Sequence, residues 1–233
     1  MSSHQSIPEE YTDGYVVFMG NRFIVDERVL IPRLETEELV KYCLKFLEKN
    51  PHIQTIADIG TGSGIIPISL CEKIDRPLRV FATDMSQEAL DLAEENFHQG
   101  QKTKDKRQND GITFLQGDLL HPLIRELRNS PPEEMLITAN LPYVREVEIN
   151  SGLIHEPRMA FLGGVQTGFE LYERFFDQLF TWKQRPRKCH VIIEFGLWQR
   201  DIAETVFMSK NCSYTFFADL RGIERFAHIC LSR

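Results

Sequence analysis

The stretch that decides the fold is Thr55-Ile56-Ala57-Asp58-Ile59-Gly60-Thr61-Gly62-Ser63-Gly64. Its first half is a short and mostly apolar run, which predicts a buried strand over 55–59. Its second half is rich in glycine, which allows a sharp turn and lets a ligand approach the backbone. A helix is expected to follow, to about Lys73. The stretch therefore predicts a strand–loop–helix unit of an α/β sheet, in which ligands bind at the carboxyl ends of the strands.

The same alternation continues on both sides of this unit. We expect further strands at about 79–84, 112–116, 135–139, 189–195, 214–219 and 224–231, and helices at about 35–49, 86–97, 169–182 and 198–208. A four-residue turn at 220–223 makes the last two strands antiparallel. Residues 15–18 and 22–25 predict a hairpin with Gly20-Asn21 in its turn. The predicted fold class is α/β: a Rossmann-like, seven-stranded, mostly parallel sheet with an antiparallel C-terminal hairpin, preceded by a short N-terminal β-hairpin.

Composition narrows the function classes. The 233 residues carry a net charge of -7, and a mildly acidic chain is not suited to non-specific nucleic-acid binding, which needs a basic face. The polar stretch 101–110 predicts a solvated loop, although its bases could contact a nucleic acid. No apolar run approaches the roughly 20 residues that cross a bilayer. Five widely spaced cysteines predict free thiols, a reducing cytoplasm and no metal site.

Acidic residues follow two of the predicted strands. Asp84 ends the strand after the glycine loop, where it could accept both hydroxyls of a ribose or cap the helix that begins at Ser86. Asp118 ends the third strand, where it could accept a hydrogen bond from an adenine amino group or stand in a turn. Because the loop and Asp84 lie on consecutive strand ends, the pattern favours an adenosine-type ligand.

The fourth strand runs into Asn140-Leu141-Pro142-Tyr143. The Asn140 side-chain oxygen and the Leu141 carbonyl can each accept one N–H, and Pro142 keeps Leu141 extended. Tyr143 adds an aromatic face for a planar group. The segment could also be a proline turn with a capping Asn, but beside the glycine loop it favours a site that holds a planar NH2 group.

These motifs resemble those of the HemK-type protein-(glutamine) methyltransferases, a family related to release factor glutamine methyltransferase that uses S-adenosylmethionine (SAM). The resemblance spans about residues 15–230. It rests on Phe23-x-Val25, Val29-Leu30-Ile31-Pro32-Arg33-x-Glu35-Thr36-Glu37, the 58–64 loop, Asp84, Gly117-Asp118, Asn140-Leu141-Pro142-Tyr143, Glu156-Pro157-Arg158, Gly163-Gly164, Gly168, Glu194-x-Gly196 and Asp219-Leu220-x-Gly222-Ile223-x-Arg225. It implies a class I SAM-dependent methyltransferase fold and the product S-adenosylhomocysteine.

The resemblance also implies a set of site residues. The cofactor residues would be Asp58, Gly60, Thr61, Gly62, Ser63, Gly64, Asp84, Met85, Asp118, Leu119 and Asn140. The catalytic segment would be Asn140, Leu141, Pro142 and Tyr143, and the substrate residues Arg33, Glu35, Asn140, Pro142, Tyr143 and Glu156. Arg33 and Glu35 could instead form a structural ion pair, and Glu156 a surface salt bridge. The implied substrate is the glutamine of the Gly-Gly-Gln motif of a peptide-chain release factor, or a ribosomal protein.

The sequence departs from the family pattern in two ways. The family reads Asn-Pro-Pro-Tyr, whereas Leu141 stands at the first proline and restores a backbone N–H. The family also carries an N-terminal helical domain, which we expect to be absent here and which a partner chain could replace. We expect residues 1–14 to be a flexible N-terminus, 15–50 a hairpin and lead-in helix, and 51–233 the methyltransferase domain.

Two other functions stay open on the residues alone. Asn-Leu-Pro-Tyr is similar to the motif of ribosomal RNA adenine dimethylases, so an N6-adenine methyltransferase acting on RNA or DNA is the first alternative. Against it stand the acidic charge and the Ile-Pro-Arg-x-Glu-Thr-Glu element. The second alternative is a non-catalytic module of the same fold that supports a partner.

Overall fold

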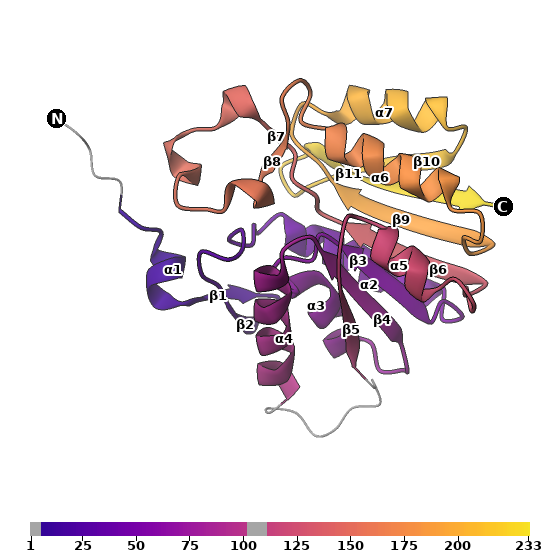
Figure 1. Ribbon diagram of the computed structural model, residues 1–233, viewed down its shortest axis with the longest axis horizontal. Helices are drawn as coiled ribbons and strands as arrows, with labels where there is room; N and C mark the ends of the chain where they lie inside the picture. Colours follow the sequence, from indigo (N-terminus) through magenta and orange to yellow (C-terminus); the bar gives the residue numbers. More distant parts are fainter. Residues whose placement is uncertain (1–5, 102–110) are drawn as a thin grey trace.

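The computed structural model describes residues 6–101 and 111–233 (Figure 1). Its main sheet consists of β3 (Thr55–Ile59), β4 (Arg79–Asp84), β5 (Ile112–Gln116), β6 (Glu134–Ala139), β9 (Lys188–Glu194), β10 (Ser213–Ala218) and β11 (Glu224–Ser232). The strand order is β10-β11-β9-β6-β3-β4-β5. Strands β3, β4, β5, β6 and β9 are parallel, whereas β11 is antiparallel to both β9 and β10. The predicted seven-stranded fold class is confirmed.

Helices cover both faces of this sheet, as Figure 1 shows. They are α2 (Thr36–Lys49), α3 (Ile65–Lys73), α4 (Gln87–Gln101), α5 (His121–Glu126), α6 (Glu170–Thr181) and α7 (Arg200–Ser209). One apolar cluster joins α5, α6 and α7 to one face, and another joins α2 and α3 to the opposite face. On α6 the buried side chains Tyr172, Phe175, Phe176 and Leu179 recur at helical spacing. Among the described residues, none of the helices combines the length and apolarity needed to span a membrane.

The N-terminal hairpin packs on the same face of the sheet as α2 and α3. Strands β1 (Tyr15–Phe18) and β2 (Asn21–Ile24) are antiparallel, with Phe18 opposite Asn21. The turn is therefore Met19-Gly20 and not Gly20-Asn21, because both of these residues take positive φ angles of 51° and 84°. The Met19 N–H donates to Glu37 Oε1 (2.8 Å), which ties the turn to α2.

Part of the segment expected to be flexible has regular structure. Residues Glu9–Asp13 form the short helix α1, and the Tyr11 hydroxyl donates to the Val29 carbonyl (2.6 Å). Residues 1–5 lie outside the described part of the chain. So does most of the polar 101–110 stretch, so its prediction as a loop is not tested.

The connection from β6 to α6 is the part the sequence did not predict. It contains the parallel pair β7 (Val144–Arg145) and β8 (Leu162–Gly164) and three short 3-10 helices (Glu146–Glu148, Ser151–Leu153 and Arg158–Ala160). Helix α5 was not predicted either. This connection lies next to the N-terminal segment, because Glu156 accepts a hydrogen bond from the Ile31 N–H (2.9 Å).

Candidate active site

The site lies where the chain reverses its direction across the sheet. From β3 the chain builds β4 and β5 on one side, and then crosses back to place β6 on the other side of β3. Ligands of doubly wound sheets bind at this switch point, beyond the carboxyl ends of the strands. Ile59 pairs with Ala139 in the register of β3 and β6. The glycine loop and Asn140 therefore begin side by side.

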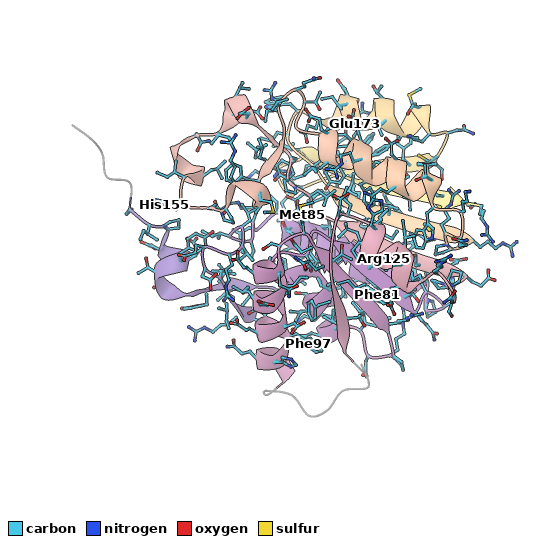
Figure 2. All side chains as sticks on the ribbon, viewed as in Figure 1. Phe81, Met85, Phe97, Arg125, His155 and Glu173 are labelled. Atoms are coloured by element: carbon cyan, nitrogen blue, oxygen red, sulfur yellow. The ribbon has the colours of Figure 1, made fainter. Side chains whose placement is uncertain are left out.

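A cavity of about 560 Å³ opens at this point, within the size range of cofactor pockets. Of the predicted site residues, Arg33, Gly60, Thr61, Gly62, Ser63, Asp84, Met85, Asp118, Leu119, Asn140, Leu141, Pro142 and Tyr143 line it. Met85, labelled near the middle of Figure 2, is half-exposed although it lines the cavity. Four predicted residues, Asp58, Gly64, Glu35 and Glu156, are outside the lining. The structure thus brings most of the predicted set together around one cavity.

Asp84 fixes the glycine loop. The Gly62 N–H donates to Asp84 Oδ2 (2.9 Å), and the Ser86 N–H donates to Oδ1 (3.0 Å). Burial raises the pKa of Asp84, while these N–H donors act in the opposite direction. Gly62 has a φ of 54°, which favours glycine. The Ser86 hydroxyl also accepts from the Ala89 N–H (3.2 Å), so Ser86 caps the N-terminus of α4.

Asp58 and Gly64, the two ends of the glycine-loop motif, pack against the protein interior and not toward the cavity. Asp58 is fully buried and accepts a hydrogen bond from the Thr138 hydroxyl (2.7 Å). Burial raises its pKa to about 6. A Cβ on Gly64 would lie 3.1 Å from the Ala93 Cβ, so this glycine lets α3 and α4 approach each other. Neither residue reaches the cavity.

Asp118 is held by helix α6. Its carboxylate accepts hydrogen bonds from Arg174 Nη2 (2.8 and 2.9 Å) and from Gln178 Nε2 (2.9 Å). The next residue, Leu119, has a φ of 49°, which is unusual for a residue other than glycine. Its carbonyl accepts from the Thr83 hydroxyl (3.1 Å), which holds this turn against β4 at the cavity wall.

Asn140 is held by its amide nitrogen. Nδ2 donates to Thr36 Oγ1 (3.1 Å) and to Glu194 Oε2 (3.2 Å). Leu141, the departure from the family pattern, uses its extra N–H to donate to the Tyr172 hydroxyl (3.0 Å). The donor that a proline would lack therefore has a partner inside the protein, and the segment is anchored at both residues.

Glu194 lies under this segment and was not predicted as a site residue. It is fully buried, and it accepts from the Thr36 hydroxyl (2.8 Å) as well as from Asn140. Tyr143 Oη donates to its other oxygen at 3.5 Å. Burial raises the pKa of Glu194 to about 7. The Glu194-x-Gly196 element, one of the motifs that carry the family resemblance, was the signal in the sequence that could have marked it.

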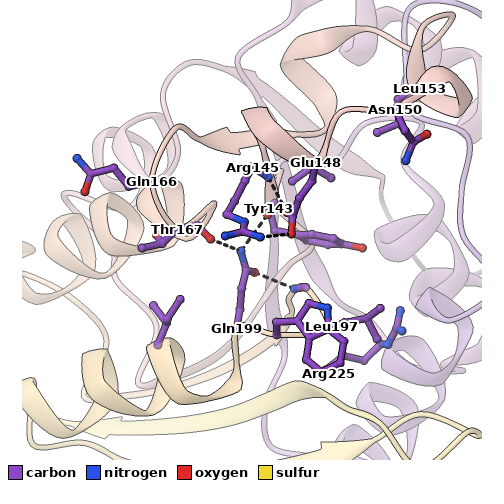
Figure 3. A pocket seen from close by; sticks show the side chains of 14 residues that line it. Tyr143, Arg145, Glu148, Asn150, Leu153, Gln166, Thr167, Leu197, Gln199 and Arg225 are labelled. Atoms are coloured by element: carbon purple, nitrogen blue, oxygen red, sulfur yellow. Dashed lines mark hydrogen bonds and ion pairs between the residues drawn. The ribbon is translucent and has the colours of Figure 1, made fainter.

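Glycines and a glutamine clamp the backbone after Asn140. A Cβ on Gly163 would lie 2.5 Å from the Pro142 carbonyl oxygen, and a Cβ on Gly168 would lie 2.3 Å from the Tyr143 carbonyl oxygen. Gln199, in the middle of Figure 3, donates through Nε2 to the Tyr143 and Thr167 carbonyls (2.9 Å each). These contacts leave the Pro142–Tyr143 backbone little freedom to move.

Figure 3 also shows a second cavity, of about 550 Å³, which shares Tyr143 with the first. Arg145, Glu148, Leu197 and Arg225 are among the residues that line it. The Arg145 N–H and guanidinium both donate to Glu148 (3.1 and 2.6 Å). This cavity borders Tyr143, the last residue of the predicted catalytic segment, on the side of β7 and β9.

The remaining substrate candidates form two ion pairs. Arg33 pairs with Glu156 (2.5 Å), and Glu35 lies 3.9 Å from Arg225. Arg33 and Glu35 therefore do not pair with each other. The Glu156 side chain is almost fully buried and joins the segment before α2 to the segment after β7. Of these residues, only Arg33 lines the first cavity, whereas Arg225 lines the second.

Comparisons with known proteins agree with this geometry. The chain is 35% identical over 231 residues to the release factor glutamine methyltransferase of Bacillus cereus. This match covers 95% of this chain and 75% of the relative. The chain is 31% identical over 233 residues to the Bacillus subtilis protein of the same name, with 95% and 74% covered. The family model for ribosomal protein L11 methyltransferase (PrmA) matches residues 36–120.

Solved structures show the same fold. The release factor-specific protein-(glutamine-N5) methyltransferase of Alicyclobacillus acidocaldarius superposes with a TM-score of 0.51 at 23% identity, covering 91% of this chain and all of that one. The catalytic domain of human METTL16, in complex with a 3′UTR hairpin, superposes with a TM-score of 0.64 at 14% identity. The match covers 96% of this chain and 88% of that one. The fold is therefore that of class I methyltransferases. On sequence, the chain belongs to the release factor glutamine methyltransferase family.

Proposed function

We propose that this chain transfers a methyl group from SAM to the side-chain amide nitrogen of a glutamine in a peptide-chain release factor. One observation carries the proposal: the Asn140 amide nitrogen is occupied by Thr36 and Glu194, and Asn140 lines the cavity. Its oxygen, on the opposite side of the amide, is therefore the atom presented to a ligand. A hydrogen-bond acceptor there suits the NH2 group of a glutamine.

The cavity residues fit SAM. The Asp84 carboxylate already accepts two backbone N–H bonds, and each of its oxygens retains a lone pair for a ribose hydroxyl. Gly60 brings the loop against the catalytic segment, because a Cβ there would lie 2.9 Å from Leu141 Cδ2. Asp118 and Leu119 form the wall assigned to the adenine. When bound, SAM supplies a methyl group activated by its sulfonium charge.

The protein's task is to aim a poor nucleophile. The lone pair of an amide nitrogen is delocalised, so the nitrogen must be held in line with the methyl group. Asn140 Oδ1 and the Leu141 carbonyl each accept one of the two amide protons, and Pro142 fixes the direction of that carbonyl. Such positioning contributes up to about 7–11 kcal/mol.

The same two acceptors also stabilise the charge that develops on the amide nitrogen during transfer. Positive charge develops on the nitrogen during transfer, and two fixed carbonyl dipoles stabilise it without reorganisation. A protonated amide is a strong acid, so its surplus proton can leave to water without a dedicated base. The Tyr143 ring closes the cavity beside the amide, and burial raises the pKa of its hydroxyl, which therefore stays protonated at neutral pH.

The test is to offer methyl-labelled SAM with three separate acceptors: a purified release factor, a ribosomal protein extract and total RNA. We expect label in the release factor, and none in a release factor whose Gly-Gly-Gln glutamine is replaced. Label in RNA alone would contradict the proposal and support the adenine alternative. Label in the ribosomal extract alone would keep the chemistry and change the substrate.

A further inference from the structure

Three hydrogen bonds determine which way the Asn140 amide points. Thr36 gives its only hydroxyl proton to Glu194 (2.8 Å), so toward Asn140 its oxygen can only accept. An ionised Glu194 can likewise only accept. Both neighbours therefore require Asn140 to face them with Nδ2, as observed at 3.1 and 3.2 Å. The opposite orientation would set the Asn140 oxygen against two acceptors.

We propose that Glu194 is the positioning residue of the catalytic segment: directly and through Thr36, its carboxylate keeps the Asn140 oxygen turned toward the substrate amide. This inference rests on the proposed function, because it assigns the group that makes Asn140 an acceptor. Glu194 also accepts from Tyr143 Oη, so one carboxylate contacts two of the four residues of the segment.

The place of Glu194 in the sheet explains why it can act this way. Ala139 pairs with Ile193 in the register of β6 and β9, so Asn140 and Glu194 are the next residues on neighbouring parallel strands. A fully buried carboxylate is costly unless it is well hydrogen-bonded. Among the described residues, the side chains that donate to this carboxylate are Thr36, the first residue of α2, and Asn140 and Tyr143 of the catalytic segment.

The charge state of Glu194 depends on the groups around it. Burial raises its pKa to about 7; Arg225 on β11 and the Thr36 and Tyr143 hydroxyls oppose this rise, and Glu35 before α2 adds to it. Tyr172 on α6 faces it from the other layer. The carboxylate form increases as pH rises through about 7. Turnover should therefore increase over the same interval, because the charged acceptor polarises Asn140 more strongly than the neutral one.

Two substitutions separate orientation from charge. Glu194→Met keeps the length of the side chain but removes both acceptor oxygens, so Asn140 can rotate. We expect kcat to fall about 100-fold, as when one fixed dipole is removed from an active site, with KM for the release factor changing much less. Glu194→Gln keeps an acceptor for Thr36 and Asn140 but removes the charge. We expect a kcat about tenfold lower and no increase with pH near 7.

The control is Glu134→Gln, which makes the same chemical change at the first residue of β6, at the end of that strand away from Asn140. Glu134 contacts His52 and Lys188 there. This variant should keep the wild-type kcat and pH profile. Calorimetry should give the same Kd for SAM in all variants, because the Glu194 carboxylate is hydrogen-bonded to Thr36, Asn140 and Tyr143 and not to the glycine loop. A Glu194→Met enzyme with wild-type kcat would overturn the proposal.

A second readout does not depend on the substrate. In the 15N NMR spectrum of wild type, the side-chain NH2 signal of Asn140 should titrate with a midpoint near 7, and Glu194→Gln should abolish this titration. A wild-type Asn140 signal that is unchanged between pH 6 and pH 8, about one unit on either side of that pKa, would overturn the inference even if the release factor is methylated. Titration without methylation would support the inference and contradict only the proposed substrate.

Discussion

Gly163 presses against the backbone of the catalytic segment, so Gly163→Ala is a sharp test of how tightly that segment is positioned. A Cβ at this position would lie 2.0 Å from the Gly168 carbonyl oxygen, 2.5 Å from the Pro142 carbonyl oxygen and 2.6 Å from Tyr143 Cα. Gly163 is not among the residues with positive φ, so alanine could adopt its backbone conformation. The obstacle is space, and the atoms in the way all belong to backbone.

The size of the effect follows from these distances. Real Cβ contacts are essentially never shorter than 3.0 Å, and the shortest one here would be 2.0 Å, so backbone must move by about 1 Å. A misplacement of 1 Å in an active site can lower the rate about 100-fold. Overpacking of this kind also costs about 1–3 kcal/mol of folding free energy. We therefore expect a folded protein with strongly reduced turnover.

The assay combines three measurements on Gly163→Ala: urea unfolding, calorimetry with SAM and turnover on the release factor. The Kd for SAM should stay at the wild-type value, because the crowded atoms belong to residues 142, 143 and 168 and not to the glycine loop. Gly100→Ala in α4 is the control, since its Cβ would meet only a side-chain oxygen of Glu72 at 3.2 Å. Wild-type turnover in Gly163→Ala would refute the reasoning.

Three further substitutions test other parts of the account. Asp84→Asn sets an NH2 group against one of two backbone N–H donors, so the Kd for SAM should rise at least tenfold in calorimetry, from the loss of about 1.5–3 kcal/mol. Leu141→Pro removes the N–H that donates to Tyr172, so it should lower the free energy of unfolding by about 0.5–1.5 kcal/mol in urea while turnover stays within about tenfold of wild type. Asp58→Asn should abolish the part of the pH dependence of folding stability that comes from the Asp58 carboxyl. The pKa of Asp58 rises from 3.8 to about 6 on folding, so wild-type stability should fall as pH increases between these values, relative to the variant, and the difference should be constant above them.

Each of these expectations can fail in a distinct way. An unchanged Kd for SAM in Asp84→Asn would remove Asp84 from the cofactor site. Loss of turnover in Leu141→Pro with SAM binding intact would mean that the N–H of Leu141 has a role in the reaction. A wild-type stability that decreases relative to Asp58→Asn as pH falls from about 6 to 3.8 would contradict the sign of the Asp58 shift.

The sequence predicts the sheet well because its signals are local. The strand at 55–59 and the acid at Asp84 each stand in a short apolar run followed by turn residues, and the structure reproduces these limits. The hairpin turn was displaced by one residue because Met19, a residue that rarely adopts a positive φ, does so here. Helix α5 is only six residues long and begins with His121-Pro122, which on sequence resembles a loop.

The candidate site was predicted only as far as single segments allow. The glycine loop and Asn140 could be found because each follows its own strand directly. Glu194 is 54 residues from Asn140, and Arg33 is 123 residues from Glu156. Their pairing depends on strand order and register, which no local pattern contains. The same holds for Gly163, whose role comes from backbone atoms about 20 residues away.

The most direct test of the account is mass spectrometry of the release factor peptide that contains the Gly-Gly-Gln glutamine, after incubation with SAM and either wild type or Asn140→Ala. Calorimetry on the same two samples reports their SAM binding. We predict one methyl group on that glutamine with wild type, and none with Asn140→Ala although it binds SAM with nearly the wild-type Kd. Methylation that persists in Asn140→Ala, or a wild-type reaction that leaves the glutamine unmodified, would contradict the central claim.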